Sequence, residues 1–181
     1  MYRTLVLRGH RTRLALCGMC CVALAVVLCG CEVWVDDDYT ETDCGGHNWQ
    51  QDAFTLIQDG LDAMLADELG TVHVYDGVYP ENLTVDTPST VAGEGAVTIA
   101  PASGDTIVFA GTVPVWGGAM NVTIGGTGTG VVVQAVPTSL IELDGTVFGE
   151  TLAQYIRVEV GGVSVDAEDA TFLGAGGAAV G

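Results

Sequence analysis

TVHVYDGVYPENLTV, residues 71–85, joins two short apolar alternations through a turn that contains glycine and proline. Alternation of apolar and polar residues is typical of a β-strand with one buried face. Similar short segments rich in Val, Ile and Thr recur along the rest of the chain, separated by Gly-, Pro- and Asp-rich turns. Because these residue types favour strands, the sequence predicts an all-β domain after residue 70.

Two all-β architectures fit short strands of this kind, a sandwich and a parallel β-helix, and an internal repeat favours the second. Apolar residues recur at an offset of about 24 residues, which suits a coil of three short strands with their turns. Three columns at this offset are expected to stack inside the coils, so that aspartate at position 132 would place a charge in the stack. They are Leu83, Ile107, Val131, Tyr155 and Ala179; Val108, Val132, Ile156 and Val180; and Ala100, Ile124, Phe148 and Phe172.

A short helix is predicted before the strands, because apolar residues from Phe54 to Leu65 recur at spacings of three and four. Asp52 or Thr55 is expected to cap its start. The helix, the stretch 70–85 and VAGEG at 91–95 together closely resemble the N-terminal cap and first coil of pectin-lyase-like right-handed β-helix proteins. The residues that match are Gly77, Tyr79, Glu81, Gly93 and Glu94.

This resemblance implies a right-handed parallel β-helix with an N-terminal capping helix over residues 52–181. It also implies structural roles: Gly77 in a sharp turn, Tyr79 packed under the cap, and the helix as a plug that keeps the edge of the first coil from pairing with a neighbour. The sequence ends within a coil at GAGGAAVG, residues 174–181. We therefore expect a β-helix that is truncated at its C-terminal end.

The first 30 residues have the pattern of a lipoprotein signal peptide. Four arginines precede an apolar run, Leu14 to Leu28, that is shorter than the roughly 20 residues of a membrane span. The ending LCGC, residues 28–31, resembles the lipobox of bacterial lipoproteins, which implies lipid attachment at Cys31; a secretory signal without lipid is the alternative. We expect an exported protein anchored to the bacterial cell envelope, with the outer membrane favoured, and an acidic tether over residues 31–51.

Charge limits the partners of the exported chain. All 23 acidic residues follow the predicted signal peptide, there is no lysine, and Arg157 is the one arginine after residue 30, which gives a formal net charge of −22. Nucleic acid, acidic polysaccharides and anionic headgroups are repelled by such a surface. The expected partners are the membrane, through the lipid anchor, and a neutral carbohydrate or a basic protein surface.

No residue of this chain is expected to be catalytic. Arg157 is the one candidate for the arginine base that pectate lyases use, and in IRVEV it lies mid-strand beside Glu159, where an ion pair on the outer wall is favoured. The Asp-Phe-Ile-Phe-Gly stretch of pectin methylesterases does not occur. The sequence thus predicts a surface binding or structural module that requires no cofactor. The alternative is the N-terminal portion of a polysaccharide-degrading enzyme, pectin-lyase-like or a glycoside hydrolase.

One set of residues keeps a chemical role open. LIELD (140–144) and VSVDAED (163–169) align at the 24-residue offset, so Glu142 is expected to stack over Asp166 and Asp144 over Glu168. We refer to these four residues as the acidic ladder. A solvated outer face is the favoured interpretation, a calcium site the second, and a pair of acids for hydrolysis the third.

The sequence also contains two isolated ring side chains outside the acidic ladder, His73 and Trp116. His73 alternates with valines and is expected to face solvent or an edge without a partner. Trp116 lies next to two glycines, where it either covers an edge of the core or stacks on a sugar ring.

Overall fold

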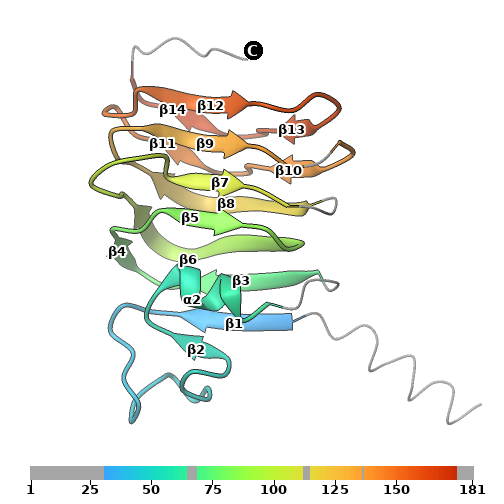
Figure 1. Ribbon diagram of the computed structural model, residues 1–181. Coiled ribbons are helices and arrows are strands. Elements are labelled where there is room, and N and C mark those ends of the chain that lie inside the picture. The colour runs from blue at the N-terminus through green and yellow to red at the C-terminus, as the bar shows by residue number, and fades with distance from the viewer. Residues whose placement is uncertain (1–30, 65–68, 112–114, 136, 175–181) are drawn as a thin grey trace, which may run out of the picture. The chain divides into compact units, whose positions relative to one another are not determined.

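The computed structural model describes residues 31–64, 69–111, 115–135 and 137–174, and nearly all of their regular structure is β-strand (Figure 1). The predicted signal peptide, residues 1–30, lies outside the described residues. In chain order the elements are β1 (Cys31–Val35), β2 (Ala53–Phe54), α2 (Ile57–Asp62), β3 (Gly70–Val74), β4 (Gly77–Tyr79), β5 (Leu83–Val85), β6 (Ser89–Ile99), β7 (Ile107–Phe109), β8 (Trp116–Ile124), β9 (Thr129–Val133), β10 (Leu140–Glu142), β11 (Val147–Phe148), β12 (Gln154–Val158), β13 (Ser164–Asp166) and β14 (Thr171–Phe172).

The strands stack in parallel as a β-solenoid of about four turns (Figure 1). One face has the order β13-β10-β8-β6-β3-β1-β2, and a separate sheet has the order β12-β9-β7-β5. The long strand β6 belongs to two faces, because its first part pairs with β3 and its last part with β4. The predicted fold class, an all-β parallel β-helix with coils of about 24 residues, is confirmed. Its short helix is α2, which follows β1 and β2 instead of preceding all the strands.

The predicted register holds in part of the stack. Leu83, Ile107 and Val131 are opposite one another, as are Ile124, Phe148 and Phe172. Three predicted neighbours differ by one residue: Ile156, not Tyr155, is opposite Val131; Arg157, not Ile156, is opposite Val132; and Ile99, not Ala100, is opposite Ile124. Each difference amounts to an offset of 25 instead of 24, which one extra residue in a turn produces. Ala179 and Val180 lie outside the described residues.

The core follows from alternation along the strands. In β7, Ile107 and Phe109 are fully buried while Val108 between them is half-buried. Each buried aliphatic or aromatic side chain contributes about 1.5–3 kcal/mol, and like residues stack from coil to coil. Val132 is fully buried, as expected, but its neighbours in register are Val108 and Arg157, and the core cluster contains Val131 and Val133 without it.

The helix α2 closes the N-terminal end of the core. Its buried residues Ile57 and Leu61 pack beneath the first coil. Neither Asp52 nor Thr55 caps it, because the N-cap residue is Leu56 and no side chain of the cap bonds back. The cap comes from the next coil instead: the Glu81 carboxylate accepts hydrogen bonds from the backbone N–H groups of Ile57 and Gln58, at 3.0 and 3.1 Å.

The helix was expected to keep the edge of the first coil from pairing with a neighbour. At β5, the side chain of Gln58 from the helix covers this edge. The Gln58 amide accepts a hydrogen bond from the Thr84 N–H at 2.8 Å and donates one to the Thr84 carbonyl at 3.2 Å. One side chain thus satisfies both backbone groups that a further strand would otherwise pair with. The edge of β3 is covered differently, by pairing with β1.

Four of the residues that match the cap motif lie in the strands β4 and β6. Tyr79 is buried and donates to the Tyr75 carbonyl at 3.1 Å, and burial raises the pKa of its phenol well above its ordinary value. Gly77 lies in β4 without a left-handed φ, so the expected sharp turn is wrong; a side chain there would meet the Asp37 carboxylate. Gly93 and Glu94 lie at the corner of β6, where the register with β8 shifts.

The segment expected as a tether, residues 31–51, is part of the folded stack in the structure. Cys31–Val35 form β1, whose five residues all pair with β3. The chain then runs through a series of turns and returns as β2, which pairs with Trp34 and Val35. The physical reason is alternation: Val33 and Val35 are buried under the first coil, so this short stretch gains more from burial than from solvation.

Candidate functional site

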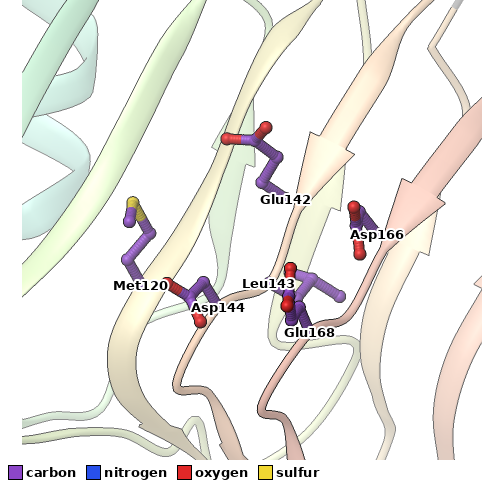
Figure 2. Close-up of a pocket in the computed structure, with 6 residues that line it drawn as sticks. All are labelled: Met120, Glu142, Leu143, Asp144, Asp166 and Glu168. Carbon is purple, nitrogen blue, oxygen red and sulfur yellow. The ribbon is translucent and has the colours of Figure 1, made fainter.

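The structure brings the acidic ladder together. Glu142 at the end of β10 is opposite Asp166 at the end of β13, as predicted, and Ile141 is opposite Val165 on the inner side. Asp144 and Glu168 follow in the adjoining turns. All four acids, with Met120 and Leu143, line an open hollow of about 150 Å³ (Figure 2).

The four carboxylates are exposed and do not converge on one point. Figure 2 shows them spread along the ends of β10 and β13 and the turns that follow. Among the described residues, the group of three acids that each have a carboxylate oxygen within 4.8 Å of the others is Asp36, Asp37 and Asp38, in the turn after β1. At a strand spacing of about 4.8 Å, two solvated carboxylates repel by only about 1 kcal/mol, so the ladder is tolerated without a bound cation.

Arg157, the other candidate for chemistry, makes three polar contacts on the outer wall of the second sheet. Its guanidinium contacts the Asp105 carboxylate at 2.8 Å, the Glu159 carboxylate at 2.8 Å and the Thr129 hydroxyl at 3.0 Å. Glu159 also accepts a hydrogen bond from the Gln134 amide at 2.8 Å. The predicted pair with Glu159 is confirmed, and the network ties three successive coils together.

The Asp105 carboxylate is adapted to this network. Burial raises the pKa of Asp105, but hydrogen bonds from the backbone N–H and hydroxyl of Thr129, together with the charge of Arg157, outweigh that effect and hold the pKa below its ordinary value. The folded state therefore prefers the ionised form more strongly than the unfolded chain does. The stability that this preference contributes is fully present above the ordinary pKa and is lost as the pH falls through the lowered one.

This linkage gives a pH prediction for Asp105→Asn. The wild-type melting temperature is expected to fall more steeply than that of the variant below about pH 4, because the variant has no carboxylate at position 105 to protonate. Thermal melting between about pH 7 and pH 3 checks it. Asp86→Asn is the matched control, since Asp86 is exposed and its substitution should leave the steepness unchanged. Equal slopes for wild type and Asp105→Asn would contradict the role of the network.

His73 has partners, so the expectation of an unpaired histidine is wrong. Its Nδ1 lies 2.6 Å from Oε1 of Glu94. Its ring stacks on Trp34 at a centroid distance of 5.6 Å, and His47 stacks on the same indole at 3.9 Å. The pairing with Glu94 spans 21 residues, a separation that the 24-residue repeat does not predict. Trp34, in the segment expected as a tether, is the residue that sequence reasoning missed.

Trp116 is exposed and does not cover the core. It lines a second shallow hollow of about 150 Å³, whose other lining residues are Leu69, Thr90, Gly117, Leu140 and Glu142. Its indole N–H is directed to the Thr138 carbonyl at 3.4 Å. The exposed part of the ring is therefore its hydrocarbon edge and face.

Cys31, the expected site of lipid attachment, is the first residue of β1 and is half-buried against the core. Its register neighbour is Gly70 at the start of β3. No helix among the residues that the structure describes is both long and apolar enough to span a membrane.

Comparisons of the chain with models of protein families, with curated proteins and with solved structures give no match.

Proposed function

We propose that the protein is a lipid-anchored, exported β-solenoid that acts at the cell surface as a structural or binding module. The observation that carries this proposal is the set of contacts that the Arg157 side chain makes. The one strongly basic side chain after residue 30 contacts two carboxylates and a hydroxyl on the outer wall of β12. A base in this arrangement makes structural contacts through all three of its nitrogens, and it lies on a different sheet from the acidic ladder.

The signal-peptide pattern and the lipobox resemblance support export and anchoring through Cys31, with the outer membrane of the cell envelope favoured. Stacked coils give a rigid body whose faces present the same residue types at a regular spacing. The charge of −22 favours a neutral carbohydrate or a basic protein surface as the partner of such a face. In this role the acidic ladder is a solvated coat that adds to solubility.

The alternative function is the N-terminal portion of a polysaccharide-degrading enzyme of the pectin-lyase-like or glycoside hydrolase type. The observation that favours it is that all four ladder acids line one open hollow. Carboxylates on neighbouring parallel strands are able to bind calcium or to share the work of acid and base in hydrolysis. In that case the ladder, not Arg157, would carry the chemistry.

Calcium titration of the full chain, followed by thermal melting, separates the two functions. For a structural module we expect the melting temperature to stay constant up to millimolar calcium. A ligand that binds the folded state at about 100 times its Kd stabilises by about 2.7 kcal/mol, so a real site would be visible as a shift of several degrees.

Two double variants locate any effect. Asp144→Asn with Glu168→Gln removes two charges from the acidic ladder, and Asp36→Asn with Asp37→Asn removes two from the acidic turn after β1. A calcium-induced rise that disappears only in the ladder variant would contradict the solvated coat and favour the enzyme. A rise that disappears only in the second variant would place calcium in the turn and leave the ladder without a metal.

A further inference from the structure

Three large apolar side chains are exposed along one flank of the solenoid. Leu69, Trp116 and Leu140 are 61 %, 59 % and 39 % exposed, and they line the same shallow hollow. We call these three residues the apolar strip. Trp116 and Leu140 are opposite each other in register, and Leu69 directly precedes β3. A contiguous apolar surface on a chain with so many acids indicates a contact surface.

The apolar strip and Cys31 lie at the same ends of their strands. Cys31 is the first residue of β1, Trp116 the first of β8 and Leu140 the first of β10, and all the pairings between them are parallel. The order β10-β8-β6-β3-β1 separates Cys31 from the start of β8 by three strand spacings and from β10 by four. At about 4.8 Å a spacing, the strip runs from about 5 to about 20 Å from Cys31.

We propose that this flank lies on a zwitterionic lipid surface, with the apolar strip at the boundary between headgroups and acyl chains. The inference rests on the proposed lipid attachment at Cys31 and goes beyond it, because an anchor alone does not fix the orientation of the solenoid. Cys31 is itself paired with Gly70, so no spacer separates the anchor from the sheet. The bilayer surface therefore lies within reach of every member of the strip.

The chemistry of the strip fits the polar–apolar boundary of a membrane. Tryptophan is favoured there, since its ring is amphipathic. In Trp116 the indole N–H is directed to the Thr138 carbonyl, which leaves the hydrocarbon part of the ring exposed between two leucines. Glu142 borders the same hollow and matches the ammonium group of a zwitterionic headgroup, whereas anionic headgroups are repelled.

Fluorescence quenching tests the orientation. The full chain, processed in a bacterial host that lipidates lipoproteins, is reconstituted into phosphatidylcholine vesicles that carry bromine atoms on their acyl chains. Bromine quenches only indoles at the membrane. We expect a loss of about a third of the emission, the share of one tryptophan among three. The loss should disappear in Trp116→Phe and persist in the matched variant Trp49→Phe, and Leu69→Asp with Leu140→Asp should reduce it.

Three results would overturn the inference, and they are distinguishable. A chain that carries lipid at Cys31 by mass spectrometry and floats with the vesicles, but is not quenched, would refute the flank contact and leave the anchor intact. A chain without lipid at Cys31 that does not float would refute the anchor and the orientation that rests on it. Saturable change of the Trp116 emission by neutral oligosaccharides, without quenching by bromine, would assign the strip to a sugar.

Discussion

Replacing Ile107 with aspartate is expected to abolish cooperative folding of the solenoid. Ile107 is fully buried in β7 and lies in register between Leu83 and Val131, which are buried as well. A carboxylate at this position would have no partner in an apolar stack, and the cost, about 5 kcal/mol or more, is comparable with the whole stability of a typical domain. Circular dichroism during thermal melting measures the loss.

Val108→Asp is the matched control, since it makes the same change one residue later in the same strand. Val108 is half-buried, and its neighbours in register are Thr84, which is exposed, and Val132, which is buried. We expect this variant to fold and to lose at most about 1–2 kcal/mol. Equal losses in the two variants, or a larger loss at Val108, would show that β7 does not alternate between inside and outside as described.

Local patterns were enough to predict the architecture, because each coil of a β-helix consists of short alternating segments that stack on the equivalent segments of the next coil. The same holds for Glu142 over Asp166, whose coils follow the repeat without insertion. The repeat fails at the first coil, where Val72 is opposite Val91, only 19 residues later. Turn lengths differ between coils, and an average period does not contain that information.

Contacts that depend on side-chain reach were beyond prediction from the sequence. Arg157 meets Asp105 across 52 residues, and His73 meets Glu94 across 21; neither distance is a multiple of the coil length. The strand β1 was missed for a different reason. Its alternation, CEVWV, is only five residues long and directly follows the predicted signal peptide, so its pattern could not be separated from the apolar pattern of that segment.

Gly118→Ala is expected to destabilise the solenoid although it adds a single methyl group. Gly118 lies in β8 between Thr90 of β6 and Glu142 of β10. A Cβ atom at this position would overlap the main-chain atoms of Glu142, which have no freedom to rotate away. One of the two strands has to move, and we expect a loss of about 2–3 kcal/mol in the free energy of unfolding, measured by chemical denaturation.

The control for this effect is Gly161→Ala, where a Cβ atom meets nothing within 4 Å and the backbone has no left-handed φ. There the substitution should be neutral or stabilise by about 0.5 kcal/mol, because alanine restricts the unfolded chain. The contrast between two identical substitutions isolates the close approach of β8 and β10. If Gly118→Ala were as harmless as Gly161→Ala, the spacing of these strands, and with it the position of Glu142 in the acidic ladder, would have to be looser than described.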